Sequence, residues 1–158
     1  MLSSNEMNNE TVQDDRRARS LKMIKQLVDL RTETLVLFNE LARQKPFRKE
    51  SGAPELLQKF CESLIDYTAD GHFQLYRHIA EKTERRSGVV KIADQIYPRI
   101  LNTTETILAF NGKYDSLEHS GQLEHLDVDL SRLGENLADR IDLEDRLINV
   151  LSEARAPR

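Results

Sequence analysis

Residues 54–69 have the sequence PELLQKFCESLIDYTA, and this stretch decides the fold class. Apolar side chains recur in it at intervals of three or four residues, at Leu57, Phe60, Cys61, Leu64 and Tyr67. This spacing places them on one face of an α-helix and leaves the charged side chains on the opposite face. The stretch therefore predicts an amphipathic helix that packs against other helices through its apolar face.

The same apolar spacing continues in both directions along the chain and predicts five helical segments. They are residues 18–44, 54–69, 72–85, 89–111 and 122–153. Among the apolar positions that define them are Leu21, Phe73, Tyr76, Leu101 and Leu108. No segment alternates apolar and polar residues with the period of two that is typical of a half-buried strand.

Glycine and proline mark the predicted boundaries. Lys45-Pro46 ends the first helix, because the residue before a proline is pushed out of the α region, and Pro54 starts the second. Asp70-Gly71 is a turn signal and predicts an interruption or a bend between the second and third segments. Pro98 predicts a kink or a split in the fourth segment, and Asn111-Gly112 predicts its end.

Length and composition agree with one helical domain. The chain has 158 residues, of which 39% are hydrophobic and 32% are charged, with six glycines, four prolines and no tryptophan. Long amphipathic helices with short connections pack as antiparallel bundles. We therefore expect an all-α, antiparallel, up-and-down bundle of four main helices, one of them bent or interrupted, over residues 18–158. Residues 1–17 are polar and lack an apolar repeat, which predicts a flexible tail.

The charge balance limits the class of partner. The chain has 23 basic and 27 acidic residues and a net charge of −4, whereas direct nucleic-acid binding usually needs a basic surface. We therefore expect a basic partner and no direct contact with nucleic acid. No apolar run is long enough to span a membrane and no signal peptide is present, which predicts a cytoplasmic protein without membrane contact.

Residue types that bind metals or carry catalysis do not form a known pattern. A di-iron bundle needs Glu-x-x-His on two helices, but none of the four histidines has a glutamate three residues before it. The one cysteine, Cys61, lies on an apolar face, where a buried and unreactive thiol is expected. We therefore expect no catalytic residue, no metal and no cofactor.

Two charged residues lie on apolar stripes. Arg31 interrupts the stripe of the first helix, and Glu144 interrupts the stripe of the last. A charge on a core face is costly unless it is paired. Either each side chain reaches water at the edge of the bundle, or the two meet inside it with Arg140 as a third member. Both arrangements fit the sequence, and our hypothesis is that the side chains meet inside the bundle.

A row of mostly acidic residues lies opposite the core stripe of residues 54–69. Its members are Glu55, Lys59, Glu62 and Asp66, spaced so that they share one helical face. A solvated polar surface explains such a row. A binding face for a basic partner explains it as well, because complementary charge steers association and sets the register of a complex.

Residues 60–67 (FCESLIDY) and 69–76 (ADGHFQLY) together resemble the centre of the Rsd/AlgQ family, bacterial regulators that bind the primary sigma factor of RNA polymerase. Further similarity lies in residues 22–46 and in residues 130–151, which include Leu133-Gly134-Glu135, Arg140 and the run LEDRLI at 143–148. Ile96-Tyr97-Pro98 resembles the family's Ile-Trp-Pro. One departure is Ala69-Asp70, where relatives usually have a Ser-Ala pair before the glycine.

The resemblance implies an anti-sigma factor with a helical-bundle fold. Its implied partner is the C-terminal domain of the primary sigma factor, which reads the promoter −35 element with a basic helix-turn-helix. By the family pattern, Asp66 is an interface carboxylate that faces a sigma arginine. Glu62 lies before it, and the expected contact continues through Asp70, His72, Phe73 and Tyr76. We expect the protein to act as a monomer.

One alternative from another functional class is a bundle that binds a small molecule, or acts as an enzyme, in a polar core site. Arg31, Arg140 and Glu144 are the residues on which such a site would be built. The resemblance, the acidic balance and the missing catalytic motifs favour the protein-binding regulator.

Overall fold

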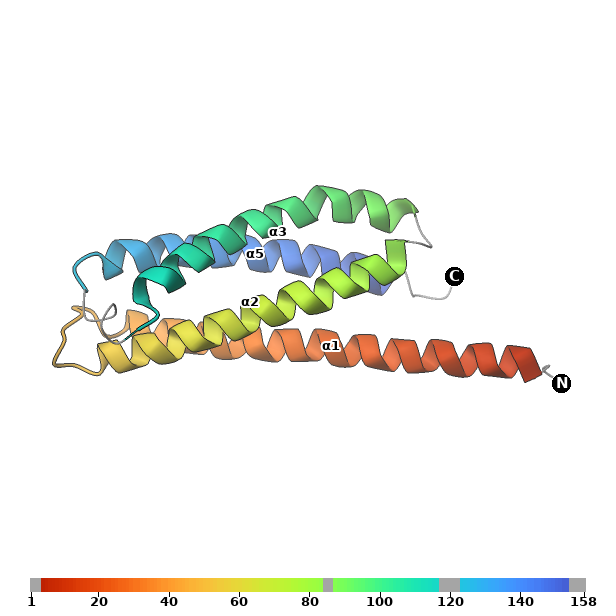
Figure 1. The fold of residues 1–158 in the computed structure, drawn as a ribbon, viewed down its shortest axis with the longest axis horizontal. Helices are drawn as coiled ribbons and strands as arrows, with labels where there is room; N and C mark the ends of the chain where they lie inside the picture. The colour runs from red at the N-terminus through yellow and green to blue at the C-terminus, as the bar shows by residue number, and fades with distance from the viewer. Residues whose placement is uncertain (1–3, 84–86, 117–122, 154–158) are drawn as a thin grey trace.

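The computed structural model describes residues 4–83, 87–116 and 123–153, and in these ranges the chain forms four helices (Figure 1). They are α1 (Ser4–Ala42), α2 (Ala53–Thr83), α3 (Ser87–Tyr114) and α5 (Leu126–Glu153). None of the described residues is in a strand. The predicted all-α antiparallel bundle is confirmed.

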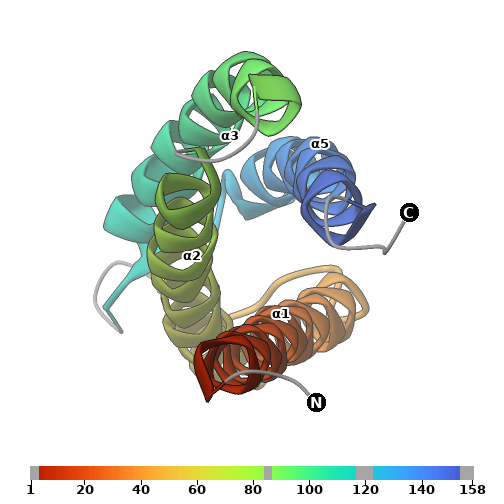
Figure 2. The same cartoon turned by 90° about the vertical axis from the view of Figure 1, so that its right-hand side faces the viewer.

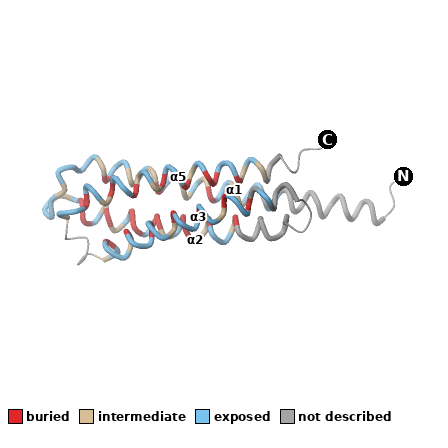
Figure 3. Tube along the Cα trace, turned by 90° about the horizontal axis from the view of Figure 1, so that it is seen from above, coloured by how far each residue is buried: buried red, intermediate tan, exposed pale blue. Residues whose placement is uncertain are grey.

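The helices pack in chain order around a common axis. Helix α1 packs on α2, α2 on α3, and α3 on α5, and the end-on view in Figure 2 shows the four helices arranged in this order. Buried positions follow the inner sides of the helices (Figure 3). The apolar face predicted for residues 54–69 is confirmed, because Leu57, Phe60, Cys61, Leu64 and Tyr67 are all buried.

Helix α1 begins much earlier than the sequence predicted. It starts at Ser4 and not near residue 18, and its 39 residues make it ~58 Å long. Its N-terminal part extends past the ends of the other helices (Figure 1). An apolar repeat marks where a helix is packed, not where its backbone hydrogen bonds begin, which explains the error. Leu21, predicted on the apolar stripe, is exposed. The division into a tail and a bundle domain stays a prediction.

The predicted interruption at Asp70-Gly71 is wrong, because α2 continues through both residues. Gly71 is buried, and a Cβ added to it would lie 3.2 Å from Leu27 Cδ1 and 3.6 Å from side-chain atoms of Arg140 and Glu144. The glycine therefore allows neighbouring helices to approach and does not form a turn.

The continuity of α2 also changes the position of Phe73. Its helical phase carries on unbroken from Leu64, so Phe73, nine residues later, lies about 180° around the helix from that core residue. Phe73 is 69% exposed, and Leu75 is the buried residue instead. The predicted apolar stripe that restarts at Phe73 is wrong for this residue. The side chain of Tyr76 lies outside the described residues.

Helix α3 continues through both sites at which the sequence predicted a kink, a split or an end. It is one helix through Pro98, so the predicted split is wrong, and it continues through Asn111-Gly112 to Tyr114. Pro98 and Asp94, whose carbonyl loses its helical donor at the proline, are both exposed, and water can satisfy that carbonyl. Leu101 and Leu108, predicted in the core stripe, are also exposed.

The last helix was predicted from residue 122 but begins at Leu126, since residues 123–125 are not helical and residue 122 lies outside the described ranges. Leu130, Leu133 and Leu137 are buried. In the described residues, no helix has a stretch long and apolar enough to span a bilayer.

Candidate functional site

The interior of the bundle contains a cluster of buried charges. Glu144 on α5 is 0% exposed, and Arg140, one turn before it, is 1% exposed. Arg140 Nε donates to Glu144 Oε2 at 3.2 Å, and Arg31 Nη1 on α1 lies 3.5 Å from Glu144 Oε1. The structure thus brings together the three residues that the pairing hypothesis named.

Other helices supply polar partners that the sequence did not reveal. The Tyr67 hydroxyl on α2 donates to Glu144 Oε1. Arg140 Nη1 donates to the hydroxyls of Thr103 and Thr104 on α3, at 3.1 and 2.8 Å. The cluster therefore joins all four helices: the Glu144 carboxylate connects α1, α2 and α5, and Arg140 connects α3. A tyrosine on a core stripe was the available signal, since a buried hydroxyl needs a partner.

Opposing effects act on the pKa of the Glu144 carboxyl. Burial raises its pKa above the ordinary glutamate value, because a low-dielectric interior disfavours the charged form. Arg140, the Tyr67 hydroxyl and Arg31 each act in the opposite direction. Burial also raises the pKa of the Tyr67 hydroxyl, and the nearby Glu144 adds to this effect. The phenol therefore stays protonated and serves as a donor.

Arg31 lies at the edge of this cluster, where its side chain both approaches Glu144 and reaches the surface. Each of the two arrangements considered from the sequence therefore describes part of its position. Its side chain is 14% exposed and its Nη1 donates to the exposed Asp145 at 2.9 Å, a shorter contact than the one with Glu144. Burial opposes the charge of Arg31, but the hydrogen bond and charge of Asp145 outweigh it and raise the pKa of Arg31. Arg140, not Arg31, is the main charge partner of Glu144.

The mostly acidic row on α2 is exposed along its length. Glu55, Lys59, Glu62 and Asp66 all face solvent; we refer to these four residues as the outer row. None of them holds a core position, and their formal charges sum to −2 at neutral pH. The outer row is therefore accessible to a partner.

Asp70 continues this side of α2 but turns toward α1. Its Oδ1 accepts from Gln26 Nε2 of α1 at 3.3 Å and from Gln74 Nε2 at 3.4 Å, both long contacts. Its Oδ2 is buried without a hydrogen-bond partner. Asp70 is thus held between the outer row and the α1–α2 contact, next to the buried Gly71.

Aromatic side chains lie at the end of the outer row. The exposed Phe73 ring packs edge-on against His72, with centroids 5.7 Å apart. His72 Nδ1 lies 3.0 Å from the Tyr97 hydroxyl of α3. Of the predicted contact residues, Glu62, Asp66, His72 and Phe73 are exposed, Asp70 is partly buried, and the side chain of Tyr76 lies outside the described residues.

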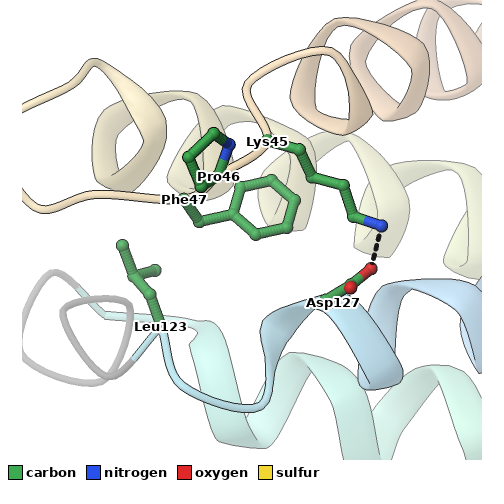
Figure 4. Close-up of a pocket in the computed structure, with 5 residues that line it drawn as sticks. All are labelled: Lys45, Pro46, Phe47, Leu123 and Asp127. Carbon is green, nitrogen blue, oxygen red and sulfur yellow. Dashed lines mark ion pairs between the residues drawn. The ribbon is translucent and has the colours of Figure 1, made fainter.

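A pocket of about 400 Å³ lies at the other end of the bundle, between the α1–α2 connection and the start of α5 (Figure 4). Its lining residues are Lys45, Pro46, Phe47, Leu123 and Asp127. The Lys45 ammonium pairs with the Asp127 carboxylate there. Asp127 is ~25 Å along α5 from Glu144, so this pocket is not the polar core site of the alternative function.

The residue types considered for metal or covalent chemistry lie apart or are buried. In the described residues, no group of three or more His, Cys, Asp or Glu side chains is placed to hold a metal ion. Cys61 is buried, and burial, with the charges of Asp115 and Glu62, raises the pKa of its thiol to about 12. A thiol with this pKa is a poor nucleophile near neutral pH.

Comparison with known proteins gives one consistent result. The family model described as "Regulator of RNA polymerase sigma(70) subunit, Rsd/AlgQ" matches residues 5–152. The chain is 34% identical to the regulator of sigma D of Yersinia pseudotuberculosis serotype O:1b over 140 residues, which cover 85% of this chain and 82% of that protein. The Salmonella paratyphi A regulator of sigma D is 34% identical over 143 residues, 85% of each chain.

The regulator of sigma D of Yersinia enterocolitica is 33% identical over 140 residues, 85% of this chain and 83% of that protein. No solved structure gives a significant match. The family match extends over all four helices and includes both the buried charge cluster and the outer row. The chain belongs to the Rsd/AlgQ family of regulators of the RNA polymerase sigma(70) subunit.

Proposed function

We propose that this protein is an anti-sigma factor that binds the C-terminal domain of the primary sigma factor through the outer row of α2. Family membership supports a sigma factor as the partner. The single observation that carries the choice of surface is that Asp66 is exposed on a mostly acidic helix face that ends in an exposed phenylalanine.

The chemistry of the two surfaces fits. A sigma domain that reads DNA through a helix-turn-helix carries basic residues on its recognition surface. The outer row offers three carboxylates within about three helical turns, with one lysine between them. Opposite charges on facing surfaces speed association and set the register of the complex. Occupation of the −35-reading surface would keep that domain from the promoter and so modulate transcription.

The proposal is tested by replacing Asp66 with alanine and measuring affinity for the purified C-terminal domain of the primary sigma factor by calorimetry. Removal of the carboxylate leaves a desolvated arginine of the partner without its counter-charge, which costs about 2–5 kcal/mol, so we expect at least about 30-fold weaker binding. The melting temperature should stay unchanged, because Asp66 is exposed and holds no core position.

Asp139→Ala is the matched control. Asp139 is an exposed aspartate on α5, and its loss changes the net charge by the same amount. Its affinity for sigma should stay within twofold of the parent. Equal affinity of the folded Asp66→Ala variant and the parent would place the binding face elsewhere. Failure of the parent protein to bind the sigma domain would refute the choice of domain.

The remaining properties follow from the same proposal. We propose that the protein acts in the cytoplasm, where its partner works, as a monomer that forms a one-to-one complex. It makes no direct contact with nucleic acid, because its binding face is acidic. The alternative of a small-molecule or catalytic core site gains no support from the buried cluster, whose named polar atoms bind one another and the hydroxyls of Tyr67, Thr103 and Thr104.

A further inference from the structure

Two exposed leucines on α3 lie on the side of that helix that borders α2. Leu101 and Leu108 are 40% and 53% exposed. They follow Tyr97 at four and eleven residues, which places all three on one helical face. Tyr97 reaches His72 of α2, with 3.0 Å between the hydroxyl and Nδ1. The leucine face of α3 is therefore turned toward the seam with α2.

The other end of the α2–α3 seam is also defined by contacts. Gln58 Nε2 donates to the carbonyl oxygen of Tyr114 at 3.2 Å. The two helices thus run antiparallel with His72 beside Tyr97 and Gln58 beside Tyr114. Leu101 and Leu108 fall between these two contacts, next to the part of α2 that carries Glu62 and Asp66.

Phe73 extends this apolar surface across the seam. Its exposed ring packs on His72, which in turn contacts Tyr97. We refer to His72, Phe73, Tyr97, Leu101 and Leu108 as the aromatic–leucine strip. Scattered apolar residues on a surface need no explanation, but exposed apolar residues that gather along one seam beside a charged row are typical of a protein-binding surface.

We propose that the aromatic–leucine strip is the apolar half of the partner-binding surface, and that it binds a helix with apolar side chains on one face and basic side chains along the adjacent edge. This inference rests on the proposed function and specifies the chemistry of the bound segment. The outer row, with a net charge of −2, lies on the same face of α2 as Phe73 and selects a basic edge. A neutral or acidic helix would leave these carboxylates opposed to apolar or like-charged groups.

The spacing of the leucines sets the pattern of the bound helix. Leu101 and Leu108 are ~10 Å apart along α3, about two helical turns. A helix laid along the seam therefore presents apolar side chains seven residues apart to the leucines. Basic side chains three or four residues from these would lie over Glu62 and Asp66. Apolar anchors of this kind carry most of the affinity in helix-in-groove complexes.

The two halves of the surface should respond differently to salt. Exposed charges are screened by added salt, whereas the burial of apolar surface is not weakened by it. Loss of Asp66 should thus reduce the salt dependence of sigma binding. Loss of the leucines should lower the affinity at every salt concentration and leave the salt dependence as it is in the parent.

The test compares three variants of the full chain for binding to the C-terminal domain of the primary sigma factor at low and high salt. They are the Leu101→Gln plus Leu108→Gln double variant, Asp66→Ala, and Val128→Gln. Val128 is 54% exposed on α5 and serves as the matched control for the loss of an exposed apolar side chain. Melting temperatures of all variants show that they remain folded.

We expect the leucine variant to bind at least tenfold more weakly than the parent at both salt concentrations, and Val128→Gln to bind as the parent does. If the leucine variant binds as tightly as the parent, this inference is overturned and the proposed function stays intact. The same holds if Val128→Gln loses as much affinity as the leucine variant. A parent protein that does not bind the sigma domain at all refutes the proposed function, and this inference with it.

Discussion

Replacement of Glu144 by leucine should destabilise the bundle more than any other single change in the buried cluster. Glu144 is the carboxylate that Arg140 contacts, and both side chains are fully buried. Without it, Arg140 keeps only the neutral hydroxyls of Thr103 and Thr104 among its hydrogen-bond partners. The guanidinium would then be a buried charge without a counter-charge.

The magnitude follows from this geometry. Removal of one partner of a buried ion pair costs about 3–5 kcal/mol, and the Tyr67 hydroxyl, which loses its acceptor, adds about 1 kcal/mol. For a chain of this length, 1 kcal/mol shifts the melting temperature by about 2–4 °C. We therefore expect Glu144→Leu to lower the melting temperature by roughly 8–24 °C. Thermal and urea denaturation followed by circular dichroism measure this loss.

A double-mutant cycle separates the charge effect from simple repacking. Arg140→Met combined with Glu144→Leu removes both charges and should recover much of the stability that Glu144→Leu loses. Arg31→Met should cost less than Glu144→Leu, because Arg31 is partly exposed and Glu144 keeps Arg140 and Tyr67. A Glu144→Leu variant within about 1 kcal/mol of the parent, or additive losses in the cycle, would refute this account of the cluster.

Three further predictions follow from single contacts. Gly134→Ala should destabilise the protein despite the better helix propensity of alanine, because the new Cβ would lie 2.9 Å from Phe38 Cζ. Gly112→Ala, whose Cβ would have nothing within 4 Å, should stabilise the protein by up to about 1 kcal/mol. Urea denaturation compares the two variants, and equal effects would contradict the close approach of Phe38 to Gly134. Burial opposes ionisation of Asp129, but hydrogen bonds from Lys113 and Tyr114 outweigh it and lower its pKa. The contribution of Asp129 to stability is therefore fully present above the pKa of an unfolded aspartate, ~3.9, and is lost as the pH falls through the folded pKa. The stability difference between the parent and Asp129→Asn should thus be largest at neutral pH and shrink below about pH 4. Cys61, with its pKa raised to about 12, should react with a thiol reagent at pH 8 only when the bundle unfolds; fast labelling of the folded protein would show an accessible thiolate.

The exposed acidic face proposed to bind the partner could be predicted from the sequence. Helical spacing alone placed Glu62 and Asp66 opposite the core stripe, and both are exposed. Phe73 was expected at this contact from the family resemblance, but the two exposed leucines, Leu101 and Leu108, were not, because they have the residue type of a core. Whether a leucine on a helix is buried depends on where the neighbouring helix lies, and the periodicity of one helix does not contain that information.

The sequence by itself determined the fold class and most positions of the core stripes, because helix formation and burial of an apolar face depend on local spacing. It also placed Arg31 and Glu144 on faces where charges need partners, and named Arg140 as a third member of the group. Only the tertiary structure decided that these three meet with Tyr67, Thr103 and Thr104, residues that come from all four helices. The roles of Gly71 and Gly134 were decided there as well. A glycine that breaks a helix and one that allows another helix to approach look the same in sequence, and they differ only in what packs against the missing Cβ.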